Sequence, residues 1–126
     1  MNARRDYQDE LPSFYGLRST VEDLAKWDQA LGNETLLKMD ILAKMCRPAE
    51  LSDGHQSSVF GRPYGFGWML GDIEGHPIAE HGGFTGTHIL RVLDNGTTVI
   101  VLTNLDVRSG SQPAVLARGV LSRQTW

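Results

Sequence analysis

The sequence is poor in cysteine, in net charge and in long apolar runs. Cys46 is the only cysteine among the 126 residues, which excludes an internal disulfide and a cysteine-based zinc cage. The 12 Lys and Arg residues stand against 15 Asp and Glu, so the formal charge is -3, and charges of both signs are spread along the chain. Binding to a nucleic-acid backbone needs a basic surface, so nucleic acid is not expected as a partner.

The longest apolar run, residues 99–102, is far shorter than the roughly 20 residues that a membrane-spanning helix needs. The first residues lead into acidic side chains, so we expect neither a membrane span nor an export signal in this chain, and its location is left open. The remaining composition is that of an ordinary globular protein, with 40% apolar residues. We expect a single domain, or part of a larger one, over residues 1–126, with residues 1–11 as a flexible lead-in.

Three helices are expected from the spacing of apolar residues. Thr20, followed by Glu22 and Asp23, is typical of a helix start, and Gly32 and Asn33 predict a left-handed end. The apolar residues of this first helix are Val21, Leu24, Ala25, Trp27, Ala30 and Leu31. The second helix is expected over residues 40–46, with Ile41, Leu42 and Met45 facing inward. The third begins near Pro113, and its apolar stripe is Ala114, Ala117, Val120 and Leu121.

After an exposed connection expected at residues 51–63, the period of the pattern changes from 3.6 to 2. Residues 64–70 alternate bulky side chains with Gly65, Gly67 and a methionine, which predicts a strand with one bulky face and one nearly bare face. Another segment should approach the bare face closely. The aromatic residues of this stretch are expected in the core rather than as a platform for a sugar or a base.

Three further strands are expected at residues 76–81, 87–93 and 97–103. Residues 71–75 should turn the chain before the first of these, and Asn95-Gly96 predicts a two-residue hairpin turn with positive φ at both positions. The last strand has apolar side chains on both faces, which indicates a central position with both faces covered. Antiparallel strands with flanking helices predict an α+β fold.

The stretch from His81 to His88 is the best candidate for chemistry. Three of its residues are glycines, which indicates that a ligand or another backbone comes close. His81 can hydrogen-bond a substrate at neutral pH, and the N–H groups beside the glycines can face an anion. A tight loop with a solvated histidine explains the same residues about as well.

Other sites are less well supported. A metal site made of His76, His81 and His88 lacks an accompanying carboxylate cluster, and Gly65-Phe66-Gly67 lacks the third glycine of a dinucleotide loop. We therefore expect no metal and no cofactor. Cys46 is expected to serve as inert packing on the inner side of a short helix.

Five segments match a known family in order and spacing. They are Gly16-Leu17-Arg18-Ser19-Thr20 with the helix that follows, Leu42-Ala43-Lys44-Met45, Tyr64-Gly65-Phe66-Gly67-Trp68, His81-Gly82-Gly83-Phe84-Thr85-Gly86 and residues 94–104. Together they resemble the C-terminal part of the serine β-lactamase-like family, which includes class C β-lactamases, D-alanyl-D-alanine carboxypeptidases and related esterases. The resemblance implies hydrolysis or transfer of a small acyl substrate.

In that family a Lys-Thr-Gly or His-x-Gly motif lines the cleft, and His81-Gly82-Gly83 matches it. The resemblance implies that His81 contacts substrate and the proton network, and that the N–H of Phe84 is one of two oxyanion-hole donors. It further implies that Gly82, Gly83 and Thr85 bind substrate.

The family's other two motifs are missing from this sequence. No serine is followed three positions later by lysine, and no tyrosine is followed two positions later by asparagine. Without an activated nucleophile, covalent acyl transfer by this chain alone is not expected. In the family, N-terminal strands complete the sheet, so we expect an open sheet edge and either a homo-oligomer or a complementing chain. The alternative is a non-catalytic binding or assembly module that kept the fold.

Overall fold

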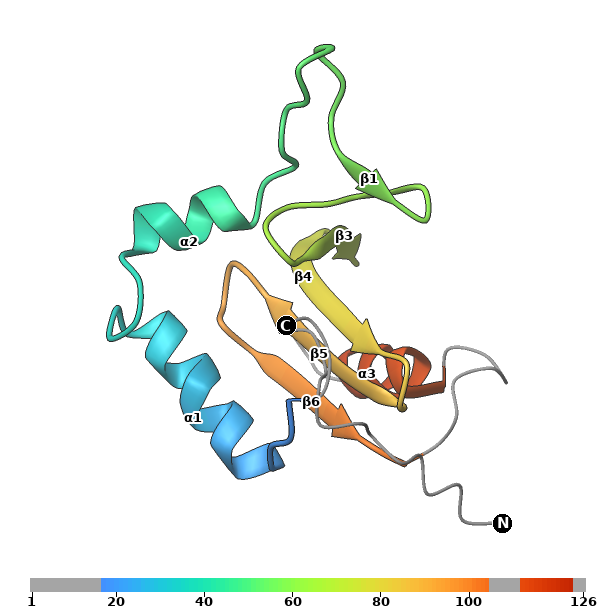
Figure 1. Ribbon diagram of the computed structural model, residues 1–126. Helices are drawn as coiled ribbons and strands as arrows, with labels where there is room; N and C mark the ends of the chain where they lie inside the picture. The colour runs from blue at the N-terminus through green and yellow to red at the C-terminus, as the bar shows by residue number, and fades with distance from the viewer. Residues whose placement is uncertain (1–16, 105–111, 124–126) are drawn as a thin grey trace.

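A computed structural model describes residues 17–104 and 112–123, so the expected flexible lead-in at residues 1–11 lies outside the described residues. Four antiparallel strands form the main sheet, with α1 and α3 on either side of it (Figure 1). The strand order is β3-β4-β5-β6, and the strands span Met69–Ile73, His76–Gly83, Thr87–Val92 and Thr98–Leu102. The three helices are α1 (Val21–Gly32), α2 (Met39–Met45) and α3 (Gln112–Leu121). The predicted α+β fold is confirmed.

Helix α1 begins where the sequence predicts. The Thr20 hydroxyl accepts a hydrogen bond from the N–H of Asp23 at 3.1 Å, which satisfies one of the unpaired donors of the first turn. The expected left-handed end is wrong, because Asn33 has a φ of -105° and the first positive φ is that of Glu34. The expected apolar stripe is only partly buried, since Val21 and Trp27 are 44% and 40% exposed.

A buried ion pair fixes α1 to the sheet. Asp28 and Leu31 are the buried residues of this helix, and Asp28 Oδ1 lies 2.5 Å from Nη1 of Arg91 on β5. The Trp27 and Trp68 rings stack at 6.3 Å between centroids. The apolar stripe of α1 did not predict that the Asp28 carboxylate faces the sheet, because its partner Arg91 lies 63 positions away in the sequence.

Helix α2 begins and ends one residue earlier than predicted, and Leu42 is buried while Ile41 stays 40% exposed. The chain leaving α2 passes directly over Gly65. A Cβ added at Gly65 would lie 2.1 Å from the Met45 carbonyl oxygen, so the close approach predicted for the bare face is confirmed at this glycine. Gly67 differs, because its surroundings are open and its φ is +82°.

Two strand predictions are wrong in their bounds. Residues 64–68 form no strand, since β3 begins only at Met69, and Phe66 is 64% exposed whereas Trp68 is buried as expected. Residues 71–73 belong to β3, so the turn is confined to Glu74 and Gly75, both with positive φ. The alternation of bulky and small residues that predicted a strand also occurs in this irregular stretch. The positive φ of Gly67 interrupts the extended backbone that a strand requires.

The expected exposed connection contains a short hairpin. β1 (Ser58–Val59) pairs with β2 (Arg62–Pro63), and the two turn residues Phe60 and Gly61 have φ values of 53° and 73°. Two positive φ values in a two-residue hairpin are typical of a type I′ turn, where asparagine is the usual first residue. Phenylalanine in that place gave no recognisable signal in the sequence.

Strand β6 is covered on both faces, as predicted, because α1 and α3 both contact it. Its central position is not confirmed, since β6 lies at the end of the strand order among the described residues. In the β5–β6 loop only Gly96 has positive φ, and its N–H donates to the carbonyl of Val92 at 3.0 Å. The loop is therefore longer than the two-residue turn predicted from Asn95-Gly96.

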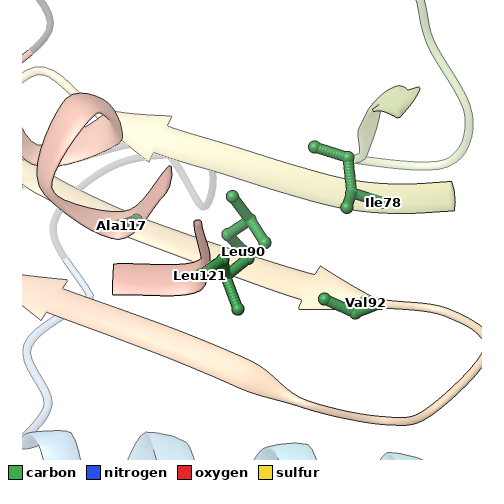
Figure 2. Close-up of a cluster of buried hydrophobic side chains, with 5 residues drawn as sticks. All are labelled: Ile78, Leu90, Val92, Ala117 and Leu121. Atoms are coloured by element: carbon green, nitrogen blue, oxygen red, sulfur yellow. The ribbon is translucent and has the colours of Figure 1, made fainter. Parts of the chain in front are cut away.

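The core lies between the sheet and α3. Figure 2 shows side chains of β4, β5 and α3 meeting there: Ile78, Leu90, Val92, Ala117 and Leu121. In α3 the predicted stripe holds for Ala117 and Leu121, whereas Val120 is 48% exposed. On the opposite face Trp68, Leu70 and Ala79 form a second cluster, against which the half-buried Cys46 packs. None of the helices in the described residues has the length and apolarity that a membrane crossing requires.

Candidate functional site

The candidate site lies at the end of β4. The ladder between β3 and β4 stops at the pair Met69 and Glu80, whereas the ladder between β4 and β5 continues to Gly83 and Thr87. Among the described residues, the last three of β4 therefore have a neighbouring strand on one side only. These three residues, His81, Gly82 and Gly83, are the ones singled out from the sequence.

A tight turn carries the chain from β4 to β5. The N–H of Gly86 donates to the carbonyl of Gly83 at 3.2 Å, and Gly86 adopts a φ of 81°. Thr103 donates to the Gly86 carbonyl from its N–H at 3.0 Å and from its hydroxyl at 2.6 Å. A turn of this kind uses the N–H of its fourth residue, so the N–H of its second residue, Phe84, takes no part in it. Phe84 is 74% exposed and Thr85 is half-buried.

The two glycines of the motif make room for side chains of β5. A Cβ at Gly82 would lie 3.1 Å from Nδ1 of His88, and a Cβ at Gly83 would lie 2.4 Å from Oγ1 of Thr87. The groups that approach this glycine-rich stretch closely, as predicted, are the side chains of the neighbouring strand β5. A ligand or a distant backbone segment is not needed to explain it.

His81 contacts Tyr64, which the sequence placed in the core. Tyr64 Oη lies 3.2 Å from Nε2 of His81, and the two rings meet edge to face with centroids 6.1 Å apart. The backbone of Tyr64 is itself held, because its N–H donates to the Ser57 carbonyl and its carbonyl accepts from the N–H of Ala49. Tyr64 therefore belongs to the candidate site, which alternation along residues 64–70 did not reveal.

Cavities open on both faces of the β4 end. The first, the α1 cavity, has a volume of about 580 Å³, and its lining includes Arg18, Ser19, Leu24 and His81. The second, the α3 cavity, has a volume of about 600 Å³, and its lining includes Phe60, Phe84, Val115 and Arg118. His81 and the two glycines border both cavities. Ser19 and His81 are thus brought to one cavity although 62 positions separate them in the sequence.

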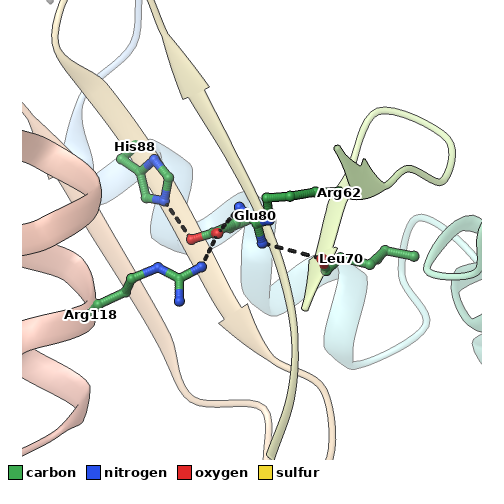
Figure 3. A network of polar contacts seen from close by, with 5 residues as sticks. All are labelled: Arg62, Leu70, Glu80, His88 and Arg118. Atoms are coloured by element: carbon green, nitrogen blue, oxygen red, sulfur yellow. Dashed lines mark hydrogen bonds and ion pairs between the residues drawn. The ribbon is translucent and has the colours of Figure 1, made fainter. Parts of the chain in front are cut away.

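A buried carboxylate sits beneath the site. Glu80 is 1% exposed and receives Arg62 and Arg118 on Oε1, while His88 Nε2 lies 3.0 Å from Oε2 (Figure 3). Arg62 also donates to the Leu70 carbonyl at 3.2 Å. Burial by itself raises the pKa of Glu80, but the hydrogen bonds from His88, Arg118 and Arg62 outweigh it and lower the pKa to about 2.

This cluster joins four elements that are distant in the sequence. Glu80 is on β4, His88 on β5, Arg62 on the β1–β2 hairpin and Arg118 on α3. Buried charges need such partners, because an unpaired carboxylate in the interior is strongly destabilised. The cluster fixes the hairpin and α3 beside the end of β4, and so shapes the α3 cavity.

The three histidines weighed as metal ligands face different partners. His76 Nδ1 lies 2.7 Å from Asp94 Oδ2, His81 contacts Tyr64, and His88 contacts Glu80. Residues 17–104 and 112–123 contain no group of three or more side chains placed to hold a metal ion. Burial raises the pKa of the Cys46 thiol, although the Arg91 charge opposes it, which favours the neutral thiol expected of a packing residue.

The family is shown by comparison with known proteins. The model of the Beta-lactamase family matches residues 2–121, which is nearly the whole chain. The chain therefore belongs to the Beta-lactamase family, and it has a β-lactamase-like serine hydrolase fold. No curated protein and no solved structure matches it.

Proposed function

We propose that this chain forms one wall of a serine acyl-hydrolase active site, with the end of β4 as the substrate-facing edge. The observation that carries the proposal is the placement of His81, which is exposed, hydrogen-bonded to Tyr64, and located where β4 loses its partner strand. An extended acyl substrate can lie along such an edge, because the backbone groups of a strand without a neighbour are open to pairing.

In this proposal each residue of the motif has a separate task. His81 hydrogen-bonds the substrate and takes part in proton transfer, and the N–H of Phe84 faces the oxyanion as one of two donors. Gly82, Gly83 and Thr85 line the place where the substrate lies. The substrate is a small acyl compound, a β-lactam, a D-Ala peptide or an ester, as in penicillin-binding proteins and class C enzymes.

The attacking serine and its lysine come from polypeptide outside this sequence. Ser19 borders the α1 cavity together with His81, but Thr20 beside it caps α1, and no lysine stands three positions after Ser19. The Ser19 hydroxyl donates to the Thr20 carbonyl at 3.4 Å, and a serine whose hydroxyl is not hydrogen-bonded to a base is a weak nucleophile. The chain is therefore the C-terminal portion of the active unit and is inactive by itself.

The first test is covalent labelling of the chain alone. We expect no change of intact mass after incubation with benzylpenicillin or with a fluorophosphonate, because no serine of the sequence is followed three positions later by the lysine that activates the family's nucleophile. Mass spectrometry checks this result. An adduct on any serine contradicts the claim that the nucleophile is elsewhere.

The second test supplies the missing part. The N-terminal portion of a Beta-lactamase family member, ending just before its counterpart of residues 16–20, is co-expressed with this chain, and hydrolysis of a chromogenic ester is measured. We expect His81→Ala to lower kcat/KM by about 100-fold, since a positioned proton-transfer group contributes that much or more. The matched control is His55→Ala, an exposed histidine on the loop before β1, which should leave the rate unchanged. Equal rates for both variants remove His81 from the mechanism.

A second candidate function is a non-catalytic assembly module. The observation that favours it is strand β6, whose five residues, Thr-Val-Ile-Val-Leu, carry no charge and no proline although they lie at the sheet edge of the described residues. Natural edge strands are protected by such residues, so an unprotected one favours pairing with another strand.

We expect the isolated chain to associate through this edge, at least to a dimer, as measured by light scattering. Val101→Lys should shift the chain towards the monomer, because a charge at a half-buried position of β6 opposes strand pairing. The control Lys44→Glu on the exposed side of α2 should not. A monomer at all concentrations contradicts the expectation.

A further inference from the structure

The α3 cavity combines apolar walls with a cationic floor. Its walls come from the β1–β2 hairpin, from the turn after β4 and from the first turn of α3, and its exposed apolar residues are Phe60, Phe84 and Val115. Their exposed fractions are 89%, 74% and 63%. Three large exposed apolar side chains gathered around one cavity form a patch of the kind that marks a ligand site.

The floor of the cavity carries more positive than negative charge. Arg62 and Arg118 both pair with the single oxygen Oε1 of Glu80, and their side chains remain 32% and 38% exposed. Glu80 is the only acidic side chain among the described residues that line the cavity. Two guanidinium groups against one carboxylate leave one positive charge, which a ligand anion can neutralise by a charge-assisted hydrogen bond.

The hairpin holds Phe60 at the mouth of the cavity in a strained conformation. Its φ of 53° is rare for a bulky side chain, and it occupies the turn position where asparagine is favoured. Arg62, two residues later, anchors the same hairpin to Glu80 and to the carbonyl of Leu70. Strain that the surrounding structure maintains at the mouth of a cavity is typical of a functional residue.

From these three observations we propose that the α3 cavity binds an apolar carboxylic acid, with an aryl or similar apolar body between Phe60 and Phe84 and its carboxylate against Arg62 and Arg118. The α3 cavity is lined in part by His81, Gly82, Gly83 and Phe84 of the proposed hydrolase site, but Arg62 and Arg118 have no role there and binding of the acid needs no nucleophile. The inference goes beyond the proposed hydrolase function. Its test measures non-covalent binding and not turnover, so its failure is distinguishable from a failure of the hydrolase proposal.

The test uses three probes with one naphthyl body and different charge. Binding of 1-naphthaleneacetate, 2-(1-naphthyl)ethanol and 2-(1-naphthyl)ethylamine to the intact chain is measured by calorimetry and by NMR. We expect the anion to bind about tenfold more tightly than the neutral alcohol, and the cation more weakly still. The net charge of -3 of the whole chain would by itself favour the cation. A preference for the anion therefore indicates the positive charge of Arg62 and Arg118 in the cavity. The Nε–Hε resonances of Arg62 and Arg118 should shift with the anion.

Variants locate the site. Phe60→Ala and Phe84→Ala should each weaken binding of the anion by about five- to tenfold, because each removes one aromatic contact. The matched control is Phe66→Ala, also an exposed phenylalanine but outside the cavity, which should change nothing. Phe60→Asn should weaken binding and also raise the melting temperature by about 3 °C, since asparagine suits the turn.

Two results would overturn the proposal. Equal affinity for the anion and the alcohol excludes the cationic floor as a recognition element. Equal loss of binding in the Phe66 and Phe60 variants places the ligand elsewhere. Because Phe60, Phe66 and Phe84 are exposed, circular dichroism should confirm that all three variants fold, and the probe series on the unaltered chain decides the charge preference without them.

Discussion

Glu80→Gln is expected to destabilise the chain by about 3 kcal/mol, a large part of the stability of a domain of this size. The substitution leaves Arg62, Arg118 and His88 around a neutral amide, so the two guanidinium groups lose the buried carboxylate that they share. Glu80 also joins the hairpin, the sheet and α3, and its loss should loosen all three. Urea unfolding followed by circular dichroism measures the change, and Glu50→Gln, at an exposed glutamate, is the control.

The same carboxylate should make stability depend on pH in acid. The pKa of Glu80 falls from 4.5 to about 2 on folding, so the folded protein holds the charged form more strongly than the unfolded chain does. Its contribution is complete above about pH 5 and is lost as the pH falls from about 4.5 through about 2. The loss amounts to about 3 kcal/mol, from the size of the shift. The Glu80→Gln variant should lack this part of the acid sensitivity, and parallel pH profiles for the two proteins contradict the assignment.

Gly65→Ala is expected to destabilise the chain by about 3 kcal/mol although it adds only a methyl group. The new Cβ would lie 2.1 Å from the Met45 carbonyl oxygen and 2.8 Å from that of Arg47, and backbone atoms cannot turn aside as a side chain can. Either α2 moves away, or residues 64–68 do. In both cases the hydrogen bond from the N–H of Phe66 to the Met45 carbonyl is lost.

The control is Gly119→Ala in α3, where a Cβ meets nothing within 4 Å. That change should stabilise the chain by up to about 1 kcal/mol, because alanine favours the helix interior. Thermal unfolding measures both variants. Equal small effects would show that α2 does not press on Gly65. Since Gly65 follows Tyr64, its substitution should also disturb the contact between Tyr64 and His81.

Sequence patterns predicted the helix start and the strands well where a structural element depends on residues close together in the chain. Thr20 begins α1 because its hydroxyl accepts from a nearby N–H, and that bond needs no distant partner. The strands at β4, β5 and β6 were found within a few residues because alternation and apolar runs depend on the chain alone. The strand prediction was wrong at residues 64–68. There Gly65 allows a close backbone contact and Gly67 adopts a positive φ, and the two glycines produce the same alternation as a strand.

The candidate site was only half visible in the sequence. The motif at His81 stood out by its glycines. Tyr64 and Arg18 lie in segments that resemble the family, but the sequence did not show that Tyr64 contacts His81 or that Arg18 lines the same cavity, because both depend on the packing of separate segments. The hairpin that presents Phe60 was predicted as an exposed connection, because phenylalanine is an unusual residue for its turn.

The sequence by itself determined the class of fold, the position of the His81 motif and the lack of a serine followed three positions later by lysine. These are properties of residue order and spacing. The family was indicated by the resemblance of five segments to known proteins. Only the tertiary structure decided that Glu80 gathers Arg62, His88 and Arg118, that Asp28 meets Arg91, and that β6 lies at the edge of the described sheet. Charge pairing and strand order depend on which segments meet in space, and many pairings of segments are compatible with one local pattern.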